Sequence, residues 1–258
     1  MGKFFSVSIE PDMSRDMGTT AGNVAFGDKD ILFDWTPFDV PKGSSQLKSV
    51  EAIFRGTNGA DQTTTTHDVE LIFAKSIDGN APSTLGVINA AVTASTTTGT
   101  GVGWFRNIIG SIYMDATNND NDGALTFIHT FSSSFEALRD AAILTGEPDS
   151  GTNVGFDKLY VAGIMHTTGG GLDFGTAVVL DGNVTEDSAS VLTVGTTSAL
   201  NVFQKGDVVV AQDGALAGTV KALTATSITL EANNAAALAN TDELLHKSPI
   251  RLQIGFEK

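Results

Sequence analysis

Short runs in which apolar and polar residues alternate are the feature that most constrains the fold of this chain. Residues 5–9 alternate near the start, and Ile250, Leu252, Ile254 and Phe256 alternate strongly near the end. A period of two is the pattern of a β-strand with one buried face. Similar runs lie between them, separated by segments rich in Gly, Asn, Thr and Pro that favour turns. The sequence therefore predicts an all-β protein.

Four further runs extend this pattern along the first part of the chain. Residues 31–35 predict a strand that ends at Pro37, because proline lacks the N–H that a sheet needs. Residues 47–54, 69–73 and 159–165 each place apolar side chains at alternate positions. Together these runs predict a β-sandwich of the jelly-roll-like type.

A polar segment, residues 118–123, separates two apolar runs at residues 104–113 and 125–131. Its Asp-Gly end predicts a β-hairpin that joins the two runs. The segment also resembles the first half of a calcium-binding loop, although the twelfth position, where such loops carry Glu, is His129. We interpret the segment as a hairpin turn, with calcium binding as the alternative.

One short helix is predicted at about residues 135–144. Ser133 is its expected N-cap, and Glu136 stands at the capping-box position. Gly146 and Pro148 follow the apolar positions and would end the helix.

The last quarter of the chain changes character. From residue 181 to residue 245 the apolar runs are short, their side chains are small, and Phe203 is the sole aromatic residue. This pattern predicts a small, closed β-barrel. The final strand, residues 250–256, has large apolar side chains that match the first part of the chain better. We therefore predict a main sandwich domain of residues 1–180 plus 248–258, with the barrel, residues 181–247, inserted into it.

Charge and residue usage exclude several classes of function. The chain has 30 Asp and Glu against 15 Lys and Arg, and its formal net charge is −15. Such an acidic chain repels phosphate backbones and anionic membranes, so we expect no direct nucleic-acid partner and no membrane. No apolar stretch approaches the roughly 20 residues that span a bilayer. The chain has no Cys, which excludes disulfides, zinc–thiolate sites and thiol catalysis.

No motif in the sequence predicts catalysis, a metal site or a cofactor. The Gly-rich run at residues 99–103 lacks the strand–helix frame of a nucleotide site. The chain has no Gly-x-Ser-x-Gly elbow, and its histidines have no metal-binding spacing. We expect all four to be structural; they are His67, His129, His166 and His246. The sequence therefore predicts a protein that is not an enzyme and that works by docking onto other proteins.

Two sets of residues resemble structural proteins of tailed bacteriophages, especially those of marine and cyanobacterial phages. The first comprises residues 33–43, Phe-Asp-Trp-Thr-Pro-Phe-Asp-Val-Pro-Lys-Gly, and the strand at residues 68–75. The second, residues 205–208 with 218–220 and 227–230, is similar to small β-barrel modules of phage virion proteins. The resemblance implies a capsid decoration (cement) protein on the outer surface of a phage head, which it stabilises. Its implied partners are the major capsid protein or other virion proteins, and copies of itself, most often as a trimer.

Four aromatic residues are the candidate contacts with such partners. Phe4 and Phe5 lie near the N-terminus, and Trp35 and Phe38 lie in the Pro-bounded segment. Simple core packing is the alternative interpretation for each of them.

Other functions stay open at this point. One is a tail, baseplate or fibre-base component. Another, of a different class, is a carbohydrate-binding or adhesion module that uses loops near Trp35 or Trp104. A hydrolase with dispersed acidic residues is a further alternative.

Overall fold

The computed structural model describes residues 3–14, 25–55, 67–77, 79–92, 106–114, 128–134, 143–145, 156–167, 172, 174, 178–195 and 197–258. The backbone alone is described for residues 67, 128–134 and 143–145. Within these ranges the regular elements are β-strands, apart from one 3-10 helix, η3 (Ala199–Asn201). The chain is all-β, as its alternating pattern predicts.

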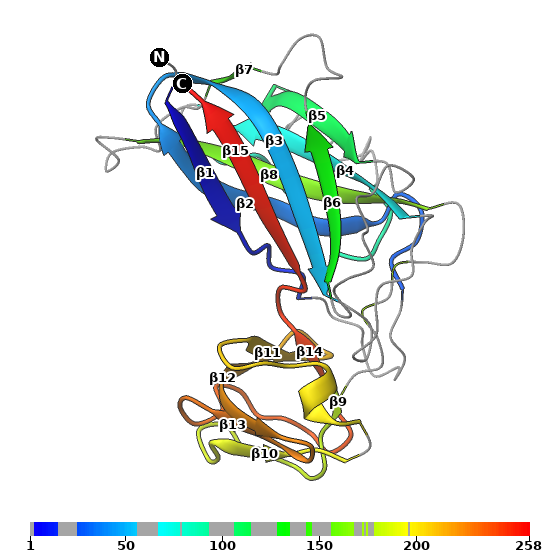
Figure 1. The fold of residues 1–258 in the computed structure, drawn as a ribbon. Coiled ribbons are helices and arrows are strands. Elements are labelled where there is room, and N and C mark those ends of the chain that lie inside the picture. Colours follow the sequence, from blue (N-terminus) through cyan, green and yellow to red (C-terminus); the bar gives the residue numbers. More distant parts are fainter. Residues whose placement is uncertain are drawn as a thin grey trace.

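Two antiparallel sheets form the upper part of the molecule in Figure 1. One sheet has the order β1 (Phe4–Ile9), β15 (Ile250–Glu257), β3 (Ser44–Arg55) and β6 (Ile128–Ser134), and β7 (Ile143–Thr145) also pairs with β3. The other sheet has the order β2 (Ile31–Pro41), β8 (Phe156–Thr167), β4 (His67–Lys75) and β5 (Ile108–Met114). The first and last strands of the chain, β1 and β15, are therefore direct neighbours.

The two sheets pack face to face over one apolar core. The predicted alternation of β15 is confirmed, since its four apolar side chains are all buried there. Phe38 of β2 links the sheets. Its ring lies edge-on to Phe73 in its own sheet, with centroids 6.5 Å apart, and stacks on Phe256 of the opposite sheet at 6.1 Å. Burial of such rings is a large part of what holds a sandwich together.

The end predicted for β2 is wrong, because the strand continues through Pro37 to Pro41. Pro37 lies opposite Tyr160 of β8, and the pairing of β2 with β8 shifts register twice before it. β2 is the outer strand of its sheet. Proline is tolerated there because the missing N–H can face away from the neighbouring strand.

The predicted hairpin across residues 118–123 is also wrong. β5 pairs with β4 in one sheet, whereas β6 pairs with β3 in the other. β5 and β6 therefore belong to different sheets and are not hairpin partners. Residues 118–123, with the calcium alternative, lie outside the described residues.

The predicted helix is wrong at both of its described ends. Ser133, the expected N-cap, pairs with Val50 inside β6, and Ile143 and Leu144 belong to β7. Residues 135–142 lie outside the described residues. At both ends, ladder hydrogen bonds to β3 satisfy the backbone and outweigh the local helical spacing.

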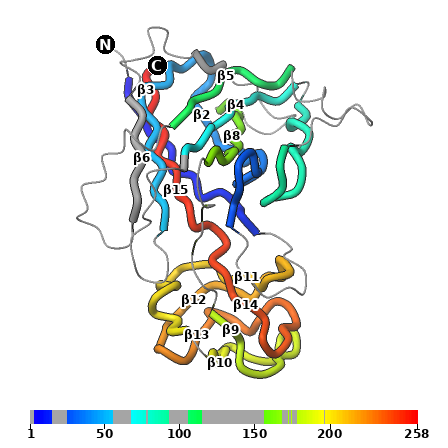
Figure 2. Tube along the Cα trace, turned by 90° about the vertical axis from the view of Figure 1, so that its right-hand side faces the viewer, coloured from blue at the N-terminus to red at the C-terminus, as the bar shows by residue number. Residues whose placement is uncertain are grey.

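A third sheet forms the lower part of the molecule (Figures 1 and 2). Its order is β10 (Val191–Thr193), β13 (Ser227–Leu230), β12 (Leu216–Thr224), β11 (Val208–Ala211), β14 (Glu243–His246) and β9 (Val178–Val179). The two outermost strands, β9 and β10, are themselves linked. Leu180 forms a bridge with Val194, and Gly195 N donates to Val179 O at 2.9 Å. This unit has its own core of small apolar side chains, into which Phe203 is buried.

The third sheet lies between β8 and β15 in the sequence. Its strands begin at Val178, just before the predicted boundary at residue 181, and end at His246. β14 leads through residues 247–249 directly into β15, so the chain re-enters the sandwich at this point (Figure 2). Both termini lie at the opposite end of the sandwich (Figure 1).

Candidate functional site

The four aromatic residues predicted as contacts do not form one surface. Phe4 is 73% exposed, whereas Phe38 is buried in the sandwich core. Phe5 is partly buried and stacks on Phe256, with ring centroids 5.1 Å apart. Trp35 is partly buried, and its indole N–H donates to Ser83 O at 2.8 Å. Of the four, only Phe4 presents most of its side chain to solvent. Core packing, the alternative interpretation, describes Phe38 best, because Phe38 is buried.

A cleft of about 620 Å³ lies where the sandwich meets the lower unit. The sandwich contributes residues 53–55 at the end of β3, together with Glu10 and the start of β15. The lower unit contributes residues 200–208 and His246. Clefts between structural units are common places for ligand sites. We therefore take this junction as the candidate functional site.

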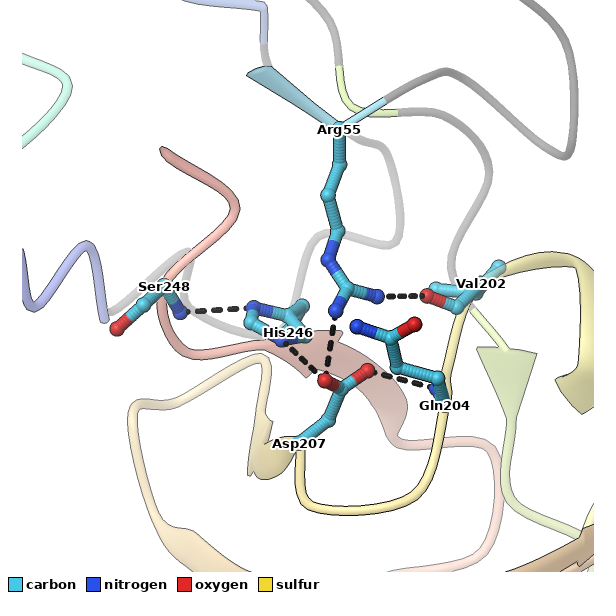
Figure 3. Close-up of polar contacts among 6 residues, drawn as sticks. All are labelled: Arg55, Val202, Gln204, Asp207, His246 and Ser248. Carbon is cyan, nitrogen blue, oxygen red and sulfur yellow. Dashed lines mark hydrogen bonds and ion pairs between the residues drawn. The ribbon is translucent and has the colours of Figure 1, made fainter. Parts of the chain in front are cut away.

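Arg55 and Asp207 join the two units across this cleft (Figure 3). Arg55 Nη2 lies 2.6 Å from Asp207 Oδ1, and Arg55 Nη1 donates to Val202 O at 3.1 Å. The other carboxylate oxygen of Asp207, Oδ2, accepts the backbone N–H of Gln204 at 2.7 Å. Arg55 stands at the last position of β3, and Asp207 in the turn before β11, so each strand end holds one partner.

His246 lies on the other side of the same carboxylate. Its Nε2 is 3.1 Å from Asp207 Oδ1, at an angle that does not make a well-aligned hydrogen bond. Its Nδ1 accepts the backbone N–H of Ser248 at 2.9 Å. An Nδ1 that accepts carries no proton, so these contacts place a ring proton on Nε2, the nitrogen that faces Asp207.

The surroundings of Asp207 favour its charged form. Burial alone raises the pKa of Asp207, but His246, the Gln204 N–H and Arg55 together outweigh burial. The pKa of Asp207 therefore lies below its ordinary value of 3.8. Asp207 is thus a carboxylate at neutral pH and forms an ion pair with Arg55.

A second set of contacts crosses the junction beside the first. Met13 N donates to Lys247 O at 2.9 Å, and Lys247 Nζ lies 3.0 Å from Asp12 Oδ2. Burial raises the pKa of Asp12, but hydrogen bonds from Ser14 and the charge of Lys247 outweigh it and lower the pKa. The segment after β1 is thereby held against the segment that links β14 to β15.

The residue types Ser248, His246 and Asp207 match those of a Ser–His–Asp triad, but their arrangement does not. Ser248 meets the imidazole through its backbone N–H, whereas a nucleophilic serine would meet it through its hydroxyl. Both oxygens of Asp207 are already occupied by partners from the protein. The geometry serves to hold two units together and does not support nucleophilic catalysis.

Sequence reasoning assigned no catalytic or metal-binding role to His246. It did not identify Arg55 or Asp207. The two are 152 positions apart, and nothing local marks them as partners. The available signal was weak: each is a charged residue directly beside a predicted strand.

A second polar group lies on the outer face of the sheet formed by β2, β8, β4 and β5. His166 Nε2 lies 3.2 Å from Glu70 Oε2, and Tyr113 donates its hydroxyl to Asp68 Oδ2 at 2.5 Å. Tyr113 is 53% exposed. Among the described residues, no group of three or more His, Asp or Glu side chains is placed to hold a metal ion.

Comparisons with protein-family models, with curated proteins and with solved structures found no match to this chain. Within the described ranges, no helix has the length and apolar character needed to cross a membrane.

Proposed function

We propose that this chain is a structural protein of a tailed bacteriophage, a capsid decoration protein that binds the outside of the head and stabilises it. On this proposal the chain is not an enzyme and needs no cofactor. Its partners are the major capsid protein and further copies of itself.

The observation that carries this proposal is the strand order of the two large sheets. Without the short β7, these sheets contain eight strands. Numbered along the chain, they pair in the orders 1-8-3-6 and 2-7-4-5. A jelly roll, which folds two Greek keys into two sheets, has this order. The order supports the jelly-roll assignment, and this fold is frequent in viral capsid and lectin domains.

We further propose that residues 178–246 form a closed barrel inserted before the last strand of the jelly roll. The hydrogen bonds between β9 and the end of β10 support closure, because they join the two outer strands of that sheet. The separate core supports independent packing of this unit. The Arg55–Asp207 pair then sets the direction in which the barrel projects from the sandwich. A decoration protein needs such a fixed projection to contact more than one capsid subunit.

The mode of stabilisation follows from mass action. A protein that binds the assembled shell, and not its separate subunits, shifts the equilibrium towards the shell. The acidic charge of the chain, −15, keeps separate copies soluble until they bind.

Location in the particle tests this proposal. An epitope inserted at Asn240, in an exposed turn of the lower unit, can be detected by immunogold labelling of purified virions. We expect label spread over the head. Label confined to the tail or baseplate would favour the alternative of a tail component, and absence of label from the whole particle would refute a virion role.

A carbohydrate-binding function is the second candidate, and one observation favours it. The exposed ring of Tyr113 lies beside the carboxylates of Asp68 and Glu70, which is a combination that sugar sites use. The site near Trp35 is less suitable, since its indole N–H is bonded within the chain. Trp104 lies outside the described residues. A glycan array probed with the native chain and with Tyr113→Ala tests this: binding lost in the variant supports it, and an array without hits rules it out.

A further inference from the structure

β1 is one of the two outer strands of its sheet, the other being β6, and one edge of β1 faces away from β15. Lys3 and Lys258 exchange two backbone hydrogen bonds, of 3.1 and 2.9 Å, and so form a hydrogen-bonded pair of the antiparallel ladder. The register continues without a shift along β1. Odd-numbered residues therefore turn their N–H and C=O groups towards β15, and even-numbered residues turn theirs outward. The outward residues are Phe4, Ser6 and Ser8.

Within the described part of the chain, no backbone group bonds to this outer edge of β1. The side chains of Phe4, Ser6 and Ser8 are also exposed, and Phe4 is an exposed large apolar residue. An open edge of this kind is a template for pairing with another strand.

The edge of β2, an outer strand of the opposite sheet, is built differently. β2 contains Pro37 and Pro41, the charged residues Asp34 and Asp39, and two register shifts. Prolines, charges and bulges are the devices by which proteins prevent pairing at an edge. β1, with the sequence Phe-Phe-Ser-Val-Ser-Ile, has no proline, no charge and no register shift. The edge of β2 is thus protected, and the edge of β1 is left able to pair.

We propose that the outer edge of β1 docks a second copy of this chain through its own β1, antiparallel and across a two-fold axis at Ser6. Charge is the reason for choosing a second copy. With a net charge of −15, two copies repel one another over most of their surfaces. Along β1 they meet with no charged side chain opposite another. A two-fold interface also needs a self-complementary patch, which an uncharged antiparallel strand provides.

In the register centred on Ser6, each outward-facing residue of one β1 strand lies opposite an outward-facing residue of the other. Ser6 opposes Ser6 of the second copy, and Phe4 opposes its Ser8, so the outward N–H and C=O groups form about six ladder hydrogen bonds. On the core-facing side Phe5 opposes the second copy's Val7, an aromatic–β-branched pair that stabilises sheets. The two sheets become one continuous sheet. This inference does not depend on the virion role, and it gives a two-fold dimer, unlike the trimer that the phage resemblance implies.

Cysteine cross-linking tests the pairing directly, because the native chain has no Cys. In a hydrogen-bonded antiparallel pair the two Cα atoms are about 5.5 Å apart, within the roughly 4.4–6.8 Å range of disulfides. Ser6→Cys therefore places the two thiols side by side on the axis, where a small backbone adjustment allows a disulfide. Ser8→Cys is the matched control on the same strand, since its two copies lie four positions apart, about 13 Å. Ala232→Cys, exposed on the lower unit, reports random collision.

We expect Ser6→Cys to form disulfide dimers at least about tenfold faster than either control, because pairing raises the local thiol concentration towards the millimolar range. In sedimentation experiments the cysteine-free chain should shift towards dimer as its concentration rises. Ser6→Lys should remain monomeric, because it sets two ammonium groups opposite each other. At concentrations where the native chain is monomeric, the thermal unfolding of Ser6→Lys should match that of the native chain, since Ser6 is exposed.

Three results would overturn the proposal. One is equal cross-linking rates for all three cysteine variants. Another is an oligomer, such as a trimer, whose mass Ser6→Lys leaves unchanged. The third is a photo-cross-linker at Ser6 that captures a different virion protein, which would assign the edge to a foreign strand.

Discussion

Replacement of Arg55 by Met tests whether the junction is held by its ion pair. Met retains most of the aliphatic stem of Arg and loses the guanidinium, so packing changes little. The variant loses the 2.6 Å contact with Asp207 and the 3.1 Å bond to Val202 O. It also leaves Asp207, whose side chain is 6% exposed, without its arginine partner.

The expected cost follows from these contacts. A hydrogen bond to a charged group contributes about 1.5–3 kcal/mol, and removing one partner of a fully buried ion pair costs roughly 3–5 kcal/mol. Arg55 is 26% exposed, and Asp207 keeps its contacts with the Gln204 N–H and His246. The cost should therefore lie in the lower part of the range that these two values cover together. We expect Arg55→Met to lower the free energy of unfolding by about 2–3 kcal/mol. For a chain of this size that corresponds to a fall in Tm of roughly 4–12 °C.

Two spectroscopic probes separate the two units in this experiment. Both tryptophans, Trp35 and Trp104, precede residue 178, so the lower unit itself contains no tryptophan, whereas far-ultraviolet circular dichroism follows the whole chain. In the native chain we expect the two urea transitions to coincide. In Arg55→Met they should separate, because the units lose part of their coupling.

Arg251→Met is the matched control. Arg251 lines the same cleft, is exposed, and forms no ion pair with another described residue. We expect its effect to stay within about 0.5 kcal/mol. Equal effects of the two variants, or a cost below about 0.5 kcal/mol for Arg55→Met, would refute the assigned role of the ion pair.

The pH dependence of the same variant gives an independent check. The folded-state pKa of Asp207 lies below its ordinary value of 3.8, so its stabilising effect is fully present above that value. This stabilising effect is lost as pH falls through the lowered pKa, because the folded and the unfolded chain then both carry the proton on Asp207. The difference in stability between the native chain and Arg55→Met should therefore be constant at neutral pH and shrink below about pH 4.

Four further substitutions test the packing of the two units, each measured by urea or thermal unfolding. A Cβ at Gly163 would overlap the ring of Phe33, which is fully buried, so Gly163→Ala should cost about 1–3 kcal/mol. Gly255→Ala meets only a serine hydroxyl that can rotate away, and its cost should be clearly smaller; equal costs would contradict this explanation. Asn234 is buried, and its side chain bonds four backbone groups of the lower unit, so Asn234→Ala should cost about 2–4 kcal/mol; an effect below about 0.5 kcal/mol would show that water replaces it. Burial raises the pKa of Glu243, whose Oε2 has no hydrogen-bond partner among the described residues, so its charge opposes folding at neutral pH. Glu243→Gln should raise Tm at pH 7, and the gain should disappear towards pH 4.5 and below; a gain independent of pH would contradict this cause.

The parts of the fold that the sequence predicts well are those set within one strand. β1 and β15 alternate because one face of each meets the core, and that pattern is local. The change in side-chain size after residue 180 also marks a unit with a separate core, and Phe203, its one aromatic residue, is buried there.

The failures share one cause, which is competition from distant strands. Ser133 and Ile143 have local neighbours that favour a helix, yet β3 offers both of them ladder hydrogen bonds. Pro37 predicts the end of a strand, yet an outer position in the sheet lets β2 continue past it. Local preferences are worth less than about 1 kcal/mol per residue, so a tertiary partner readily overrides them.

The sequence by itself thus determined the strand-forming character of the chain, the change of character near residue 180 and the lack of catalytic motifs. Only the tertiary structure decided which strands are neighbours. It brought Arg55 to Asp207 across 152 positions and left the edge of β1 open while β2 is protected. The physical reason is that the alternation of apolar and polar residues shows only which face of a strand is buried. Which strands pair depends instead on their edges and ends. Their partners come from distant parts of the chain.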